Sequence, residues 1–273
     1  MEVEMSGSSN ELLVENQGRL RIITLNRPDR MNALTPDLHH NLQDAVVEAG
    51  KDPEVGAVAL TGAGKAFCSG GDVRRSSDDA ARAERPETVE ERADKVIAHG
   101  LTSITLHRMG KPTIALVNGA AAGSGMALAL ACDMRIMSSK AVMRTAYARI
   151  GLSGDLGLSY FLHRLVGPAR AAELLFLNEK IDADICEQLG LANRVVRAEE
   201  FGAEAINLAE QLANGPTVAL RCMKQNLQTA ATGSLEQVVE REAYNTARCV
   251  RTKDVKEASL AFREKREPKF RGF

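Results

Sequence analysis

The sequence predicts an α/β fold with a mostly parallel sheet at its centre and a helical C-terminal region. Three features of the 273 residues support this prediction. Short apolar runs alternate with amphipathic helical patterns over the first two thirds of the chain, which favours right-handed βα units. One stretch, residues 118–133, joins a turn, a glycine-rich segment and an apolar helix. After Val196 only helical patterns follow.

The N-terminal third contains a hairpin pattern, a helix and a buried strand. Leu12–Glu15 and Leu20–Leu25 are strand-like runs separated by Asn-Gln-Gly, which predicts a hairpin. Thr35 is followed by proline, so we expect it to cap a helix that runs to about Ala49. Val55–Thr61 is an apolar run typical of a buried strand.

A glycine-rich junction follows this strand. Gly62–Asp72 reads GAGKAFCSGGD and lacks the GxxxxGK[ST] order of a nucleotide phosphate loop. Ser76–Arg92 is polar and charged without an apolar period, which predicts a mobile surface loop. A helix is expected from about Val89 to Met109.

The central stretch carries the strongest functional pattern. Thr113–Val117 predicts a buried strand that ends in an Asn-Gly turn, and Met126–Cys132 is apolar on every side, so a helix there must be enclosed. Between them, Gly123–Gly125 (Gly-Ser-Gly) lets a ligand approach the unpaired N–H groups of the first helical turn. Such donors can stabilise a developing oxyanion. Tight packing of helix on strand is the structural alternative.

The last quarter of the chain predicts helices over residues 199–214, 216–229 and 234–251, and a final helix to about residue 266. Their apolar stripes exceed what these helices can bury among themselves, so we expect them to pack on a partner. The stripes include Leu208, Leu212, Val218, Leu220, Met223 and Leu227. We divide the chain into a core of residues 1–197 and a helical region of residues 198–273.

Composition narrows the function classes. The 35 basic and 36 acidic residues give a formal charge of -1, which does not favour a nucleic-acid or membrane partner. The 5 cysteines show no CxxC and no Cys/His cluster at metal-ligand spacing, which predicts reduced thiols in a cytoplasmic protein without a metal site. The acidic start, Met1–Glu11, differs from a secretory signal or transit peptide, and no apolar stretch reaches the length of a membrane span.

Several motifs in fixed order resemble one family. FCSGGD (Phe67–Asp72) stands about fifty residues before NGAAAGSG (Asn118–Gly125), and ACD (Ala131–Asp133) follows. This pattern resembles the crotonase superfamily, also called the enoyl-CoA hydratase/isomerase family, and the similarity extends over nearly the whole chain, including NRPDRMNAL (Asn26–Leu34). The resemblance implies a crotonase-like spiral of ββα units that binds an acyl-CoA thioester. It also implies C-terminal helices that build a homotrimer, often paired into a hexamer.

The resemblance places two backbone donors for the thioester carbonyl on Gly71 and on Ser124, where the family usually has glycine. In comparable oxyanion holes each donor is worth roughly 3 kcal/mol. It also implies a CoA channel lined by the loop residues Met31, Ala33, Cys68, Gly70, Gly71 and Asp72, although Asp72 could instead cap the following turn. The basic end, Arg263–Arg271, could reach a CoA phosphate or be a solvated terminus. No metal or separate cofactor is implied.

The carboxylates narrow the chemistry. Hydratases of this family use two glutamates, and the matching places here hold Ala127 and Tyr147, so water activation of the usual kind is not expected. Asp155 stands where hydratases carry glycine, among apolar and small residues. A poorly solvated carboxylate there is a better proton acceptor. Its place resembles enoyl-CoA isomerases of the phenylacetate-pathway type, which shuttle a proton, and 4-chlorobenzoyl-CoA dehalogenases, in which the aspartate is the nucleophile.

Two alignment positions favour proton transfer. Dehalogenases carry a tryptophan at the position of Tyr147 and a histidine at the position of Gly100, and this chain has neither. His99 is one position from that histidine, so on a helix its side chain is rotated by about 100° from the required direction. LSYFLHRLVG (Leu158–Gly167) resembles the dehalogenases instead. We therefore favour double-bond isomerisation through Asp155. Nucleophilic attack by Asp155, in dehalogenation or thioester hydrolysis, and acyl-CoA binding without catalysis are the alternatives.

Each of these residues also has a possible structural role that does not involve a substrate. Asp155 could be the N-cap of the helix expected near Leu158, and Tyr147 could be a core aromatic or a hydrogen-bond donor to substrate. Cys68 could be a packing residue. We interpret four histidines as surface residues: His39, His40, His99 and His107.

Overall fold

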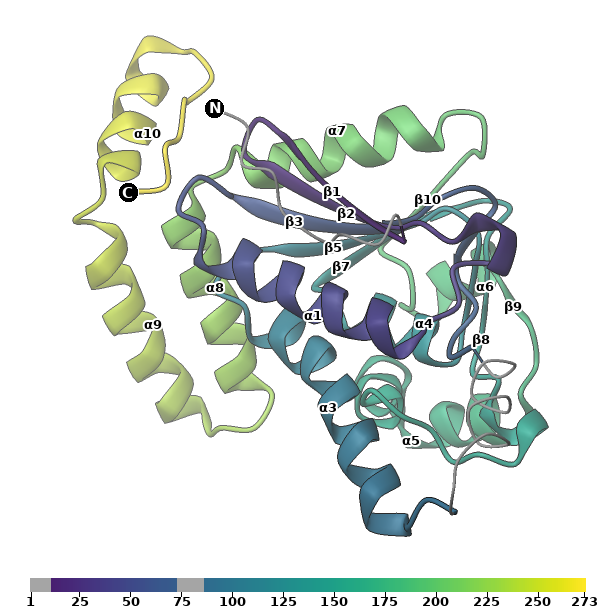
Figure 1. Cartoon of the computed structure of the whole chain (residues 1–273). Helices are drawn as coiled ribbons and strands as arrows, with labels where there is room; N and C mark the ends of the chain where they lie inside the picture. Colours follow the sequence, from purple (N-terminus) through teal and green to yellow (C-terminus); the bar gives the residue numbers. More distant parts are fainter. Residues whose placement is uncertain (1–10, 73–85) are drawn as a thin grey trace.

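The computed structural model describes residues 11–72 and 86–273, and its centre is a six-stranded sheet (Figure 1). The strands lie in the order β1 (Leu12–Gln17), β2 (Leu20–Leu25), β3 (Ala57–Gly62), β5 (Thr113–Val117), β7 (Met134–Ser138) and β10 (Arg194–Val196). β1 and β2 form the predicted antiparallel hairpin, and the remaining neighbours pair in parallel. The prediction of a mostly parallel core is confirmed.

A second, smaller sheet packs beside the first. Its order is β4 (Ala66–Cys68), β6 (Ala120–Ala122), β8 (Val142–Arg144) and β9 (Ile181–Asp182), with β9 antiparallel to β8. β4, β6 and β8 each follow directly after a strand of the large sheet, so the chain visits both sheets before it enters the next helix. This repeated path is the ββα spiral that the family resemblance implied.

The helices of the core are α1 (Pro36–Lys51), α3 (Val89–Arg108), α4 (Ser124–Ala131), α5 (Leu158–Leu177) and α6 (Ala183–Gln188), with 3₁₀ turns η1 (Pro28–Arg30) and η2 (Tyr147–Ile150). α1 has Thr35 as its N-cap, as predicted. The loop expected over Ser76–Arg92 ends earlier than predicted, because α3 begins at Val89. Its N-cap Thr88 and Glu91 form a reciprocal capping box. Residues 76–85 of that loop lie outside the described residues.

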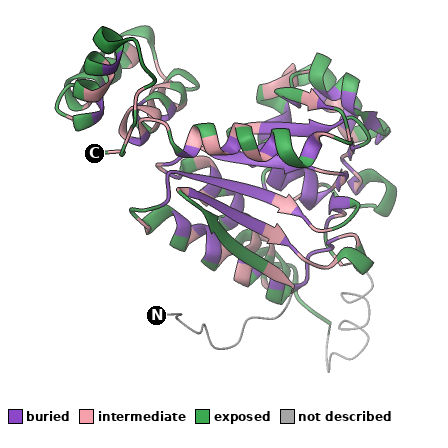
Figure 2. Ribbon diagram, turned by 90° about the horizontal axis from the view of Figure 1, so that it is seen from above, coloured by how far each residue is buried: buried purple, intermediate pink, exposed green. Residues whose placement is uncertain are grey.

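α4 is enclosed by the main apolar core. All eight of its residues are buried, which confirms the prediction from a helix without a polar face. The same core contains residues of both sheets and of α1, α3 and α5, and Figure 2 shows buried residues concentrated in the strands and on the inner faces of the helices. The glycine-rich turn before α4 is therefore attached to a part of the molecule that cannot shift without disturbing the core.

The opposite face of the large sheet is covered by α7 (Phe201–Ala213). Ala205 and Ala209 pack there in one apolar cluster with Ile22 and Ile114. We grouped this helix with the region of residues 198–273, but in the structure it belongs to the layers around the sheet. The part that projects from those layers begins after α7 (Figure 1).

α8 (Thr217–Ala230), α9 (Leu235–Cys249) and α10 (Lys253–Glu264) extend away from both sheets (Figure 1). α8 is attached to the core by Lys224, whose ammonium lies 2.8 Å from Oδ2 of Asp133 and 3.1 Å from the carbonyl oxygen of Leu106. Several large apolar side chains of these helices are exposed: Met223, Leu227, Leu235, Tyr244 and Phe262. The partner for this surface remains a prediction.

Candidate active site

Two turns that leave the small sheet at the same edge lie against each other. β4 and β6 pair in parallel, with Cys68 opposite Ala121. A Cβ on Gly125 would lie 2.1 Å from the carbonyl oxygen of Cys68, so this close approach of α4 to β4 requires glycine. A Cβ on Gly70 would lie 3.6 Å from the amide nitrogen of Ser124. The two segments expected to carry the backbone donors are therefore side by side.

Two backbone amides in these turns lie outside the hydrogen bonds of the sheets. Leu34 forms a parallel bridge with Gly71 in which its N–H donates to the carbonyl of Gly70 at 2.8 Å and its carbonyl accepts from Asp72 at 2.9 Å. Neither hydrogen bond of this bridge involves the N–H of Gly71. Ser124 is the first residue of α4, where an N–H has no acceptor within the helix. Both amides can donate to an oxygen of a ligand.

Asp155 lies beside Ser124 and is held by two hydroxyl groups. The Tyr147 hydroxyl donates a short hydrogen bond to Oδ1 of Asp155. The Ser124 hydroxyl donates to Oδ2 at 3.0 Å, and the two hydroxyl oxygens are 3.5 Å apart. The sequence indicated a backbone role for Ser124, but its side chain also belongs to the site. The signal was a hydroxyl where the family usually has glycine.

The side chain of Asp155 accepts hydrogen bonds from Ser124 and Tyr147 and does not cap α5. Gly157 is the N-cap of α5 and no side chain caps that helix, so the interpretation of Asp155 as an N-cap is wrong. Gly154, Leu156 and Gly157 have φ values of 124°, 50° and 79°. A left-handed conformation costs a residue such as Leu156 about 1–2 kcal/mol. Its buried side chain offsets that cost, so the turn that presents Asp155 is held by packing.

The electrostatics of this cluster leave Asp155 as its candidate base. Burial raises the pKa of the Tyr147 hydroxyl well above its ordinary value, and the charge of Asp155 and their hydrogen bond raise it further. Tyr147 therefore stays a proton donor. Burial also raises the pKa of the Cys68 thiol to about 12, so this thiol is not a nucleophile at neutral pH.

The family resemblance puts Ala127 and Tyr147 at the places of the two hydratase glutamates. Ala127 lies inside α4 with no exposed surface, so a methyl group occupies that place. Tyr147 lies in the site, but its hydroxyl is committed to Asp155 and Ser124. Neither side chain can activate a water molecule as a carboxylate does.

The residues expected to line a CoA channel come from two adjacent segments. The amide of Ser69 donates to the carbonyl of Met31 at 3.0 Å, and Ala33 and Gly70 lie in the same pair of segments. The side chain of Cys68 is fully buried, as the packing interpretation requires, and a place for this residue along the channel stays a prediction. The carboxylate of Asp72 lies 3.1 Å from Arg27 in an ion pair.

Three of the four histidines are placed otherwise than expected, and one of them, His107, is half-buried with its ring edge-on to those of Tyr160 and Phe161. His39, on α1, is only 6% exposed, so its interpretation as a surface residue is wrong. Its ring stacks on that of half-buried His99, on α3, with centroids 3.9 Å apart and planes at 4°. His40 points outward and pairs with Asp44 at 3.3 Å, as a surface residue does.

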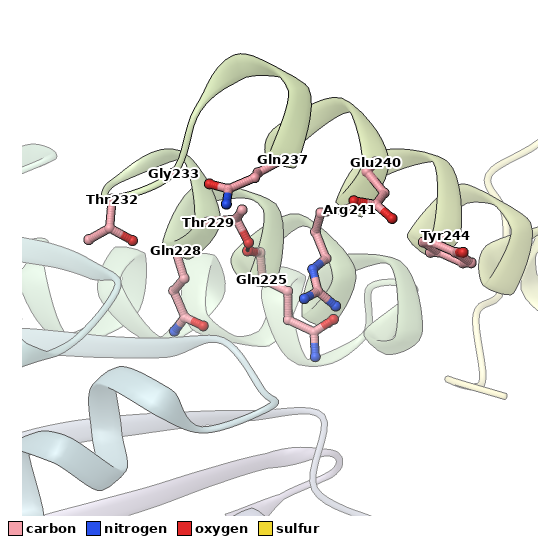
Figure 3. Close-up of a pocket in the computed structure, with 9 residues that line it drawn as sticks. All are labelled: Gln225, Gln228, Thr229, Thr232, Gly233, Gln237, Glu240, Arg241 and Tyr244. Carbon is pink, nitrogen blue, oxygen red and sulfur yellow. Dashed lines mark hydrogen bonds between the residues drawn. The ribbon is translucent and has the colours of Figure 1, made fainter.

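Two cavities lie outside the sheets. One of about 690 Å³ is bounded by α3, α5 and α8, and the two residues that follow Asp155, Leu156 and Gly157, form part of its wall together with Gly100. The other, of about 890 Å³, lies between α8 and α9 and is lined mainly by polar side chains (Figure 3). The second contains no residue of the Asp155 cluster, so the first is the cavity next to the candidate site.

Two kinds of feature are absent from the part of the chain that the structure describes. Residues 11–72 and 86–273 contain no group of three or more His, Cys, Asp and Glu side chains arranged to hold a metal ion. No helix in those residues combines the length and apolar character needed to cross a membrane. All five cysteines are free thiols, and four of them are buried.

Comparison with known proteins identifies the family. A family model described as Enoyl-CoA hydratase/isomerase matches residues 15–272. The chain belongs to the enoyl-CoA hydratase/isomerase family. The resemblance to the crotonase superfamily is thereby confirmed, and the glycine-rich turns before α4 and after β4 are the segments that the family motifs had singled out.

Relatives within the family carry names for different reactions. The short-chain-enoyl-CoA hydratase of Clostridium acetobutylicum is 33% identical over 265 residues, which cover 97% of this chain and 98% of that protein. The 1,2-epoxyphenylacetyl-CoA isomerase of Escherichia coli is 33% identical over 251 residues, 92% of this chain and 94% of that protein. A crystal structure of an enoyl-CoA hydratase from Bacillus anthracis superposes with a TM-score of 0.89 at 29% identity, over 96% of this chain and 100% of that chain. Family membership therefore leaves the reaction to be argued from the site.

Proposed function

We propose that the protein isomerises a double bond in an acyl-CoA thioester by moving a proton through Asp155. The observation that carries this proposal is the carboxylate of Asp155, which is held 3.0 Å from the Ser124 hydroxyl in a cluster that lacks both hydratase glutamates. The name of the Escherichia coli relative supports isomerase chemistry on this scaffold. The hydratase names of other relatives are outweighed here by Ala127 and Tyr147.

In this proposal the amides of Gly71 and Ser124 bind the thioester oxygen. As a proton leaves the carbon next to the carbonyl, negative charge gathers on that oxygen. Donors already in place stabilise it by roughly 3 kcal/mol each, because they need no reorganisation at the moment of reaction. The fixed packing of Gly125 on Cys68 keeps one of these donors in position.

The proton transfer balances without any other reactant. Asp155 takes a proton from the carbon next to the carbonyl of a β,γ-unsaturated thioester, and the electron pair of that bond moves into the enolate. The carboxylic acid then returns the proton to the γ carbon, and the double bond ends between the α and β carbons. Tyr147 and Ser124 keep the carboxylate in one orientation, which places its oxygens for both transfers.

We further propose a homotrimer, or a hexamer made of two trimers, in the cytoplasm. The exposed apolar side chains of α8–α10 support an assembly, because monomeric proteins seldom leave so much apolar surface in one region. The five free thiols support a reducing compartment. Light scattering of the purified chain tests the assembly directly, and a monomer would contradict it.

A panel of thioesters separates the candidate reactions. Incubation with β,γ-enoyl-CoA, α,β-enoyl-CoA and halogenated aryl-CoA substrates, with products identified by mass spectrometry and NMR, is expected to give the shifted double bond from the first. Release of halide or of free acid would instead select nucleophilic attack by Asp155. Tight binding of every thioester with no product would select a binding protein.

A further inference from the structure

Arg27 lies between β2 and the turn η1 and takes no part in the proposed mechanism. Its guanidinium binds two carboxylates and a backbone carbonyl. Nε lies 3.0 Å from Oε1 of Glu11, and both Nη atoms lie 3.1 Å from Oδ2 of Asp72. Nη1 also donates to the carbonyl oxygen of Ala33. The side chains of Arg27 and Asp72 are only 13% and 14% exposed, so water and salt screen their attraction less than that of a surface pair.

Asp72 directly follows the turn that carries Gly71, and this turn runs beside the segment after Arg27. Leu34 donates to the carbonyl of Gly70 at 2.8 Å and accepts from the amide of Asp72 at 2.9 Å. Gly71 lies between these two hydrogen bonds. The direction of its N–H therefore depends on how firmly the turn is held against its neighbour.

The turn itself contains little that fixes its conformation. Gly70 and Gly71 have no side chains, and Gly70 has a φ of 97°. No atom lies within 4 Å of a Cβ built on Gly71, so packing does not restrain this residue. Glycine has more backbone freedom to lose than any other residue. Asp72 has the first side chain after the two glycines, so its contact with Arg27 restrains the end of the turn.

The backbone of Arg27 is itself held by a buried amide side chain. The N–H of Arg27 donates to Oδ1 of Asn32 at 2.8 Å. Nδ2 of Asn32 donates to the carbonyl oxygens of Ala63 and Ala66 at 2.9 and 2.7 Å. Ala66 begins β4, which leads into the glycine turn. Arg27 is thus connected to the start of this segment through Asn32 and to its end through Asp72.

We propose that Arg27 is a positioning residue that, through Asp72, holds the amide of Gly71 where the thioester oxygen binds. This inference rests on the proposed role of that amide as an oxyanion donor. A donor stabilises an enolate best when it already points at the oxygen as the charge develops. Loosening the turn is therefore expected to lower kcat more than it raises KM.

The stretching frequency of a thioester carbonyl reports on the donors without any reaction. Butyryl-CoA with a heavy carbon isotope at its carbonyl is saturated, so it cannot isomerise, and hydrogen bonds to its oxygen lower the frequency of the carbonyl band. Infrared difference spectra of this probe are recorded on wild type, Arg27→Lys and Asp72→Asn. Lysine keeps the charge but lacks the planar set of donors of arginine. Asp72→Asn leaves the contacts of Arg27 with Glu11 and Ala33 available.

Arg21→Lys is the matched control. Arg21 lies near the other end of β2, its side chain is 7% exposed, and it pairs with Asp52 at 2.8 Å. Its replacement therefore breaks a comparable buried ion pair away from the glycine turn. Urea unfolding of Arg21→Lys and Arg27→Lys compares what each change costs the fold, and kcat and KM are measured with a β,γ-enoyl-CoA thioester.

The shift of the carbonyl band is expected to fall by about half in Arg27→Lys and Asp72→Asn, because one of the two donors is misplaced, and to stay at its wild-type value in Arg21→Lys. In the first two variants kcat should fall at least about tenfold, with KM changed less than about threefold.

A full wild-type shift in both Arg27→Lys and Asp72→Asn would overturn the role of Arg27 alone. An equal loss of shift in Arg21→Lys would also overturn it, since the effect would then be a general one on the fold. No shift in wild type would overturn this inference together with the pair of amides in the proposed function. The band does not depend on isomerisation, so a failure of that reaction is seen separately.

Discussion

The hydroxyl of Ser124 lies 3.0 Å from Oδ2 of Asp155, although 31 residues separate them in the chain. The same residue begins α4, so its amide belongs to the helix N-terminus and its side chain holds the candidate base. One residue thus connects an amide proposed as an oxyanion donor to the carboxylate proposed as the proton carrier. A glycine at this place, as is usual in the family, would keep the amide and lose the contact with Asp155.

Replacing Ser124 by alanine separates these two roles. Ser124→Ala keeps the amide and removes a hydrogen bond to a carboxylate, which is worth about 1.5–3 kcal/mol, so kcat is expected to fall about 10- to 100-fold with KM little changed. Ser153→Ala, an exposed serine two residues before Asp155, is the control and should keep full activity. A Ser124→Ala enzyme with wild-type kcat would show that the contact is incidental.

Tyr147→Phe tests the second hydroxyl. Loss of its bond to Asp155 is expected to lower kcat by a similar factor of about 10 to 100, because the carboxylate loses a fixed donor. The raised pKa of Tyr147 also means that the wild-type rate should show no fall from tyrosine ionisation up to pH 10. Steady-state rates across pH for both proteins provide the check, and a tyrosine-dependent fall below pH 10 would contradict the burial of this hydroxyl.

Gly125→Ala should damage the fold, while Gly71→Ala should not. The added Cβ at Gly125 would lie 2.1 Å from the carbonyl oxygen of Cys68, and overpacking of this kind costs about 1–3 kcal/mol or more. At Gly71 no atom lies within 4 Å of an added Cβ. Urea unfolding of the two variants should give a clearly lower midpoint for the first only. Equal midpoints would contradict the close contact between α4 and β4.

His39 should make the stability of the fold depend on pH. Its pKa is about 3 when folded and 6.5 ordinarily, so below pH 6.5 the unfolded chain binds a proton that the folded chain refuses. The unfolding free energy therefore falls by about 1.4 kcal/mol for each pH unit between 6.5 and 3 as the pH is lowered. Above pH 6.5 the imidazole is neutral in both states, so no stability is lost there. His39→Leu should lose that slope relative to wild type in urea unfolding from pH 7 to 4.5. Parallel pH curves for the two proteins would show that His39 is not buried as a neutral ring.

Much of the fold follows from local pattern. The hairpin before Asn26, the helix capped by Thr35 and the apolar α4 could be predicted because a cap, a turn or a period is written in adjacent residues. The start of α3 at Val89 was also predicted, but the loop expected before it was drawn too far, to Arg92, because the first turn of the helix is polar. α7 was grouped with the projecting helices because an alanine stripe does not say what it packs on.

The site residues that lie in sequence motifs could be predicted, and the contacts between residues far apart in the chain could not. Gly71, Ser124 and Asp155 are found by alignment with family motifs, but the bond between Ser124 and Asp155 is a contact across 31 residues that no local pattern encodes. The same is true of His39 and His99, which 60 or so residues separate and which meet only when α1 packs on α3. Burial of Cys68 likewise depends on Gly125, which belongs to another turn of the spiral.

The central claim is that Asp155 moves a proton next to a thioester carbonyl held by two amides. The most direct measurement is the rate at which wild-type enzyme and Asp155→Asn incorporate solvent deuterium beside the carbonyl of a β,γ-enoyl-CoA thioester, followed by NMR in deuterated water. We expect incorporation by wild type and a loss of about 10²- to 10⁴-fold in Asp155→Asn, with thioester binding retained. Equal rates of incorporation in the two proteins, or none in wild type, would contradict the account.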